Sequence, residues 1–266
     1  MSDALEAASL IMYPSGYGDG TLASVKPVDG TGDFTFTRGS NLSATRVAPN
    51  GYIEKGYDNL LLQSNSFDTS TWIGSNTNRT GGQQGYDGSN DAWLYEKLSL
   101  YSSIRQNITY NGVGTYSVYA KAGSLDWIRM GTSTGVISAY FDVQNGVVGS
   151  SGSSVIEAKI ESAGNGWYKC SIAFNGSISR VEIIPTEGNA TFNPASGSIY
   201  IQDAMLNQGL VAYPYIETTT APVAGGILED EPRIDFSDGC GHLLLEPSRT
   251  NLIPYSEYFG HQSKQK

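Results

Sequence analysis

Few side chains in this 266-residue chain are of the kinds that perform catalysis or hold a metal ion. The only histidines are His242 and His261, and the only cysteines are Cys170 and Cys240. No Ser–His or Cys–His pair can be formed from residues 1–241, and one cysteine beside one histidine does not supply the four ligands of a structural zinc. Two carboxylates could still meet in space, as glycoside cleavage requires, but no spacing indicates such a pair. The sequence therefore predicts a protein that is not an enzyme.

The aromatic residues favour a different chemistry, because Trp and Tyr rings stack on the apolar C–H faces of sugars. Trp93 follows a glycine-rich stretch, 81–88, and has Tyr86 and Tyr95 near it in the sequence. These three residues are the candidate glycan-binding residues. Burial of Trp93 in the core is the alternative interpretation. For the remaining tryptophans the surrounding sequence favours core packing; they are Trp72, Trp127 and Trp167.

Short strands joined by tight turns are the elements that must position these side chains. Glycine is abundant, at 32 residues, and charged residues make up only 16%, as in many β-rich chains. Strand-like runs occur at 115–121, 136–141, 167–174, 180–184 and 198–201. Asn-Gly pairs, the strongest hairpin signal, predict turns at 111–112, 145–146, 165–166 and 175–176. We therefore predict an all-β protein with an antiparallel β-sandwich, a jelly roll, over residues 59–222.

The sandwich is flanked by two stretches of different character. Residues 1–58 are broken by glycines and predict an extended N-terminal arm. Residues 223–266 predict a linker and the start of a possible second module, because Asn251–Phe259 repeats Asn59–Phe67 at four of nine positions. A complete module follows the first copy, so we expect the chain to be part of a longer protein. The alternative is that residues 251–266 form a strand docked on the first module.

The charge of the chain restricts its partners. The net charge is −10, which repels DNA and anionic membranes on average. No apolar stretch reaches 18 residues, and the N-terminus lacks the basic region of a secretory signal. We therefore predict no nucleic-acid partner, no membrane insertion, and synthesis in a cytoplasm.

Several short motifs resemble bacteriophage head-spike and tail fibre proteins. Those that resemble the N-terminal stretch of such proteins are Pro14–Tyr17, Gly30–Arg38, Ala44–Val47 and Asn50–Glu54. Those that resemble their carbohydrate-binding-module-like jelly roll are Ser117–Gly123, Asn165–Ser171 and Tyr213–Thr218. Pro232–Phe236 and Leu244–Leu252 resemble the segment that leads into such a module, although here a module is already interposed at residue 59.

The resemblance implies a structural subunit of a virion appendage, a head fibre or tail fibre, made in the host bacterial cytoplasm and located in the virion. It implies a homotrimer whose N-terminal arm, residues 1–58, serves trimerisation and attachment to capsid or tail proteins. Binding of host-surface or environmental glycans is compatible with this role. The alternatives are a dedicated glycan-binding adhesion module and, disfavoured, a fibre-borne polysaccharide depolymerase.

The resemblance also implies a structural Ca²⁺, which similar modules hold near their first and last strands. Asp203 is in phase with Ile199 and Ile201, so we expect it to point inward. A buried carboxylate needs a cation or hydrogen-bond donors. Asp68, directly after Phe67, is the matching acid at the first strand. The alternative is that Asp203 accepts hydrogen bonds from backbone N–H groups or from an arginine.

Overall fold

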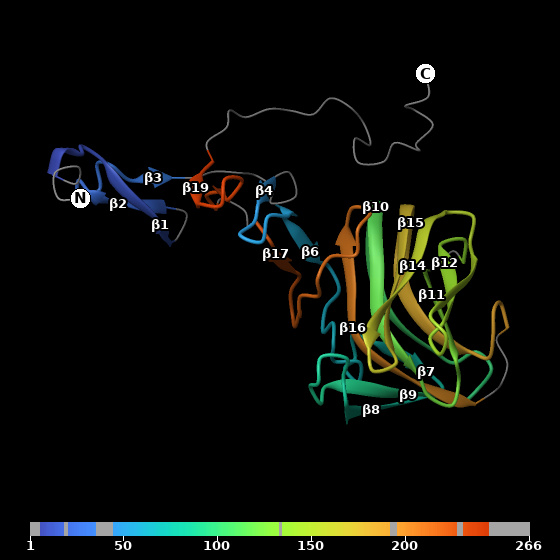
Figure 1. The fold of residues 1–266 in the computed structure, drawn as a ribbon. Coiled ribbons are helices and arrows are strands. Elements are labelled where there is room, and N and C mark those ends of the chain that lie inside the picture. The colour runs from blue at the N-terminus through green and yellow to red at the C-terminus, as the bar shows by residue number, and fades with distance from the viewer. Residues whose placement is uncertain are drawn as a thin grey trace, which may run out of the picture. The chain divides into compact units, whose positions relative to one another are not determined.

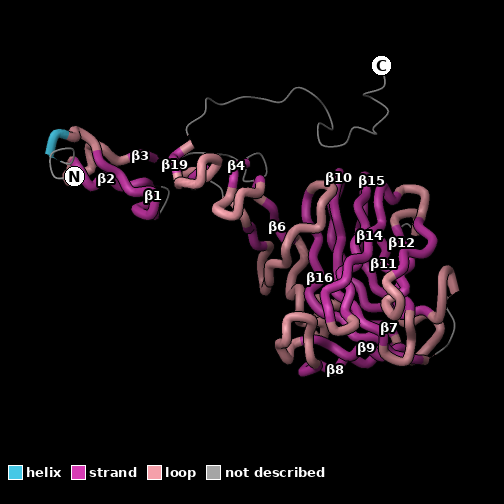
Figure 2. The backbone as a smooth tube through the Cα atoms, in the orientation of Figure 1, coloured by secondary structure: helices cyan, strands magenta, loops and turns pink. Residues whose placement is uncertain are grey.

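The computed structural model of the chain describes residues 6–18, 21–35, 45–132, 135–191, 196–227 and 231–244. These residues form strands, turns and loops, with helical backbone only at Glu6 and Ala7 (Figure 2). The predicted all-β class with antiparallel sheets is confirmed. In the described part of the chain, no helix has the length and apolar character needed to cross a membrane. Two compact units are present, one of them formed by Asp58–Val223 and the other by the described residues on either side.

The unit Asp58–Val223 is a β-sandwich built on two long paired strands, β10 (Ser103–Ala122) and β15 (Trp167–Thr186) (Figure 1). The pair runs from Ile104 opposite Ile183 to Lys121 opposite Trp167. Its Lys121 end belongs to a first layer, with β14 (Val155–Gly164), β16 (Gly197–Gln208), β9 (Ala92–Lys97) and β8 (Thr77–Gln83). Its Ile104 end belongs to a second layer, with β7 (Ile73–Ser75), β11 (Trp127–Thr132), β12 (Ser138–Asp142) and β13 (Val147–Ser151).

The two layers are joined where this long pair passes from one to the other. Gly112 of β10 lies opposite Gly176 of β15 at that crossing. The turns predicted at Asn111-Gly112 and Asn175-Gly176 are therefore wrong, because both dipeptides lie inside continuous strands. Glycine at facing positions lets the paired backbones bend without side-chain crowding. The Asn165-Gly166 turn between β14 and β15 is present, with φ of 52° and 79°.

The hydrophobic core fills the space between the layers. Tyr95 and Lys97 of β9 reach across it, and their Oη and Nζ donate to the carbonyls of Ile183 (3.4 Å) and Pro185 (3.1 Å) in β15. Side chains alternate along each strand, so every second residue enters the core. Fully buried members include Ile104, Tyr116, Val118, Ile128, Met130, Phe141, Ile172, Phe174, Ile201 and Leu206.

The opening motif, Asn59–Phe67, ties the beginning of the sandwich to its last strand. Asn59 is fully buried, and its Oδ1 accepts hydrogen bonds from the N–H groups of Leu61 and Leu206, each at 3.2 Å. Its Nδ2 donates to the carbonyls of Ala204 (3.3 Å) and Ile216 (2.8 Å). One side chain therefore satisfies backbone groups from three segments that are distant in the sequence.

A second connection from the same motif brings the two ends of the sandwich together. The Oγ of Ser64 accepts a hydrogen bond from the N–H of Thr218 (2.9 Å) and lies 2.7 Å from the Oη of Tyr215. The N–H groups of Ser64 and Gln63 donate to the carbonyls of Thr218 (3.2 Å) and Thr219 (2.8 Å). The chain therefore begins and ends the sandwich at neighbouring positions.

The flanking unit is formed by residues from both sides of the sandwich. Its first sheet contains β1 (Ile11–Gly18), β2 (Thr21–Lys26) and β3 (Phe34–Thr35). Two further pairs are β4 (Thr45–Val47) with β5 (Ile53–Lys55) and β18 (Ile234–Asp235) with β19 (His242–Leu243). The unit boundary runs through β6 (Tyr57–Asn59) and β17 (Val223–Gly225), which also pair.

Segments on either side of the sandwich contact each other within the flanking unit. The carboxylate of Asp235 accepts a hydrogen bond from the N–H of Val47 (2.8 Å), and the N–H of Phe236 donates to the carbonyl of Val47 (3.0 Å). Arg233 Nη1 donates to the carbonyl of Thr45 (3.0 Å). In connectivity, the sandwich is thus an insertion into the chain of the flanking unit. The repeated motif at 251–259 lies outside the described residues.

We predict that Asn59→Ala destabilises the sandwich by about 3 kcal/mol, because it leaves several buried backbone groups without partners. Urea unfolding of the full chain, followed by tryptophan fluorescence, measures the change. Asn90→Ala is the matched control, since Asn90 is exposed. Equal midpoints for the two variants would show that the Asn59 hydrogen bonds contribute little.

Candidate functional site

Trp93 packs against the hydrophobic core at the edge of the sandwich. It lies on β9 opposite Ile201 and is half-buried, with its ring edge-on to Phe67 at a centroid distance of 6.3 Å. Its Nε1 donates to the carbonyl of Asn65 in the opening motif (2.8 Å). The indole therefore has a structural hydrogen bond and packs against the core while it stays partly exposed.

Tyr95 is fully buried and lies on the same face of β9 as Trp93. Residues two apart on a strand share a face, and here that face is the inner one. This placement removes Tyr95 from any surface on which a sugar could stack. Burial also raises the pKa of its hydroxyl well above 10.

Tyr86, by contrast, lies on the outer face of the first layer. Its ring stacks on Tyr119 of β10 with a centroid distance of 3.7 Å and an interplanar angle of 5°. Trp167 is edge-on to Tyr86 at 6.5 Å, and the Nζ of Lys169 lies 5.8 Å from the centre of the Tyr119 ring. Sequence reasoning named Tyr86 but missed Tyr119. The alternation of Tyr119 with the buried Val118 and Ala120 was the available signal.

Asp203 meets Tyr86 on this face rather than pointing into the core. Its carboxylate accepts a hydrogen bond from the Tyr86 hydroxyl (2.9 Å), and the residue as a whole is only 5% exposed. The prediction that Asp203 shares the face of Ile199 and Ile201 is wrong because β16 contains a bulge there. The pairing of β10 with β16 shifts between Ser117 and Tyr119, and Asp203 has a φ of 55°. The carboxylate is buried, as expected, but its partner is a tyrosine.

The loop that carries Tyr86 is fixed to β16 by polar contacts. Gln202 Oε1 accepts a hydrogen bond from the N–H of Tyr86 (3.1 Å), and its Nε2 donates to Asp91 Oδ1 (2.7 Å). Glycine at position 85 allows this close approach, because a Cβ there would contact Gln202 Oε1 and the side chain would have to shift. Asp87 Oδ1 in turn accepts hydrogen bonds from Ser89, which stabilise the loop.

Burial and neighbouring charges shift the titration of this cluster. Burial raises the pKa of Asp203 to about 7, the Tyr86 hydrogen bond acts in the opposite direction, and the charges of Asp91 and Asp87 add to the rise. Burial and the charge of Asp203 raise the pKa of Tyr86 well above 10. Asp203 is therefore partly protonated near neutral pH, and the hydrogen bond from Tyr86 persists in both states.

The two predicted calcium ligands have different surroundings. Asp68 is exposed, whereas Asp203 is buried beside Tyr86. Over the described ranges, no group of three or more His, Cys, Asp or Glu side chains has the arrangement of a metal site. The calcium site stays a prediction.

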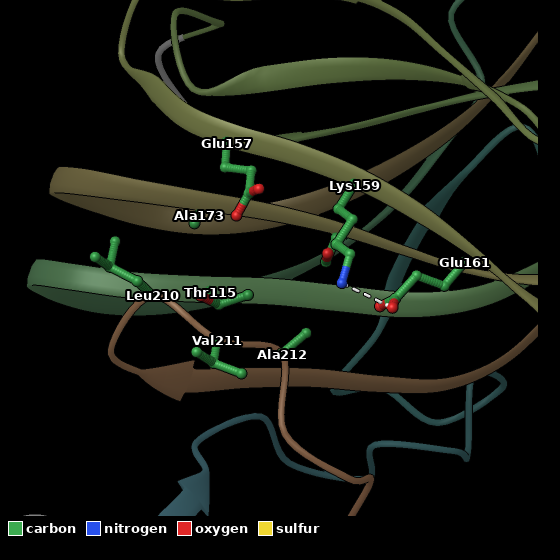
Figure 3. A pocket seen from close by; sticks show the side chains of 9 residues that line it. Thr115, Glu157, Lys159, Glu161, Ala173, Leu210, Val211 and Ala212 are labelled. Carbon is green, nitrogen blue, oxygen red and sulfur yellow. Dashed lines mark ion pairs between the residues drawn. The ribbon is translucent and has the colours of Figure 1, made fainter. Parts of the chain in front are cut away.

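A groove lies on the same outer face, between β14 and the segment after β16 (Figure 3). It encloses about 120 Å³. Lys159 and Glu161 form an ion pair across 2.7 Å at one side, and Leu210, Val211 and Ala212 form the other. The floor is contributed by Thr115, Ser171 and Ala173, and Glu157 completes the lining. Hydroxyl, carboxylate and ammonium groups beside apolar side chains can bind the hydroxyls and C–H faces of a sugar.

Comparisons with known proteins do not assign the chain. No protein-family model matches it, and no curated protein matches it. The resemblance to phage head-spike and tail fibre proteins and to carbohydrate-binding modules therefore remains a prediction drawn from short motifs.

We predict that Asp203→Asn removes part of the pH dependence of stability. The pKa of Asp203 is about 7 in the folded protein, against 3.8 for an unperturbed aspartate, so its stabilising contribution is complete below about pH 4 and is lost as the pH rises through 7. Asn tolerates the positive φ and still accepts from Tyr86. The variant should match wild type at pH 4 and exceed it at pH 8 by on the order of 3 kcal/mol.

Urea unfolding at both pH values measures this difference, with the exposed Asp68→Asn as control. A constant difference between wild type and Asp203→Asn from pH 4 to 8 would contradict the assignment.

Proposed function

We propose that the chain is a non-catalytic structural subunit of a bacteriophage virion appendage, and that it displays the β-sandwich as a side module. The observation that carries the proposal is the insertion of the sandwich. Its first and last segments are joined through Ser64 and Thr218, and the chain on both sides returns to one flanking unit. A module with neighbouring ends can branch from a shaft without interrupting it.

The hydrogen bonds of two tryptophans and one arginine support a structural role. The Nε1 groups of Trp72 and Trp93 donate to backbone carbonyls of the opening motif, at 2.9 and 2.8 Å. Arg79 donates to the carbonyls of Phe67 and Trp72. Groups engaged in this way hold the fold and are not free to act on a substrate.

The flanking unit supports assembly into a homotrimer. Among its described residues, Leu22, Ala48 and Ile227 are buried, while Val28, Tyr52 and Ile53 are 90%, 75% and 78% exposed. Apolar surface of this kind is stabilised when copies of the chain cover it. The proposed partners are thus two further copies, together with the capsid or tail proteins to which the appendage attaches.

We expect antibodies against the recombinant full chain to label the appendages of intact phage particles in immunogold electron microscopy. The same protein should sediment as a trimer at micromolar concentration. Gold confined to host debris, with particles unlabelled, would refute the virion role. A monomer in sedimentation would refute the trimer alone.

Glycan binding in the groove is the second candidate function. It is favoured by the polar and apolar groups that converge there on the outer face of the first layer. In this reading the displayed module contacts glycans of the host surface or environment.

We expect Val211→Trp to abolish binding of the full chain to a glycan array of capsule and O-antigen oligosaccharides, because the indole fills the groove. Val147→Trp is the matched control, since Val147 is similarly exposed but lies on β13 of the second layer. Binding that survives Val211→Trp, or no binding by wild type, would exclude the groove as a glycan site.

A further inference from the structure

Arginines gather on the outer face of the second layer. Arg105, Arg129 and Arg180 are three of the four arginines between residues 58 and 223. They lie on the adjacent strands β10, β11 and β15, where Arg105 is opposite Glu182 and Glu182 is opposite Gly131. The residues that alternate with them are buried in the core, which places the arginines on the opposite face; these are Ile104, Met130, Val181 and Ile183.

Glu182 neutralises only part of this charge. Its Oε1 accepts from Arg129 Nη1 (2.6 Å) and its Oε2 accepts from Arg180 Nε (3.2 Å), so both carboxylate oxygens are engaged. Arg105 is half-buried beside them, and its guanidinium group has no hydrogen-bond or ion-pair partner within the described part of the chain. Three guanidinium groups and one carboxylate leave two positive charges here. The sandwich unit as a whole has thirteen acidic against eight basic residues.

The surroundings of the arginines are rich in polar groups. Arg129 lies over Gly131, where a Cβ would be 3.0 Å from its Nη2. On β12, Ser138 pairs with Gly131 and the half-buried Tyr140 pairs with Arg129. On β10, Asn107 lies opposite Arg180. The guanidinium groups are therefore bordered by an exposed amide and a half-buried aromatic ring, whereas Ser138 is buried and its hydroxyl donates to the carbonyl of Gly135 (2.7 Å).

We propose that this arginine face, in which Arg105, Arg180 and Tyr140 are partly exposed while Arg129 is only 7% exposed, binds a carboxylate-bearing saccharide. The planar N–H donors of Arg105 match a carboxylate in a bidentate arrangement, and Glu182 holds the other two guanidinium groups in place. The exposed Asn107 side chain suits a sugar hydroxyl, and the Tyr140 ring suits a sugar C–H face. An acidic peptide shares the carboxylate, but the polar border favours the saccharide. The inference does not rest on the virion role or on the groove.

The test is binding of the full chain to oligogalacturonate at physiological ionic strength, measured by calorimetry. Arg105→Gln should weaken binding about tenfold, as expected for loss of a charge-assisted contact. Lys121→Gln is the matched control, because it removes the same charge from the first-layer end of β10. Thermal unfolding of both variants should match wild type, since Arg105 has no partner to lose within the described residues.

Three further probes separate the ligand classes: neutral dextran, dextran sulfate and polyglutamate. Oligogalacturonate binding that depends on Arg105, with no binding of dextran, supports the proposal. Binding of dextran sulfate alone would overturn the carboxylate assignment, and binding of polyglutamate alone would point to an acidic protein partner instead. Equal weakening by Arg105→Gln and Lys121→Gln, or no binding of any probe, would overturn the site.

Discussion

The buried polar groups of the opening motif are the constraint on which the rest of the sandwich depends. Asn59 and Ser64 use their side chains to satisfy backbone groups of β16 and of the segment Tyr215–Thr218. A buried amide left without these partners would cost more than the hydrogen bonds contribute, so the three segments must fold together. Because both ends of the sandwich meet at this point, the unit is closed on itself. This closure is what permits its insertion into another unit.

The same motif fixes the bulge from which the outer-face cluster arises. Asn65 Oδ1 accepts from the N–H of Asp203 (3.1 Å), and the carbonyl of Ser64 accepts from the N–H of Ala204 (3.0 Å). The bulge reverses the phase of β16, so that Ala204 points into the core and Asp203 reaches Tyr86. The opening motif therefore determines where the carboxylate of Asp203 lies on the outer face of the first layer.

Local sequence signals predicted the fold class, whereas contacts between distant residues could not be predicted. Alternating runs and the Asn165-Gly166 turn indicated antiparallel strands, because each depends on neighbouring residues only. The turn predicted at Asn111-Gly112 was wrong, because a glycine that permits a turn also permits a bend within a strand. At the candidate site, Tyr86 and Asp203 are 117 residues apart, and a one-residue bulge inverted the face expected for Asp203. Predicting the arginine face would likewise have required knowledge of the register of three strands.

Hydrogen exchange at individual amides tests the central claim most directly. The N–H groups of Leu61, Leu206 and Thr218 donate to the side chains of Asn59 and Ser64. If the opening motif closes the sandwich, these three amides exchange only through global unfolding, at the rate of core amides such as that of Ile172. Exchange of the Thr218 and Leu61 amides at the rate of exposed loops, while the core stays protected, would show that the sandwich holds together without this closure.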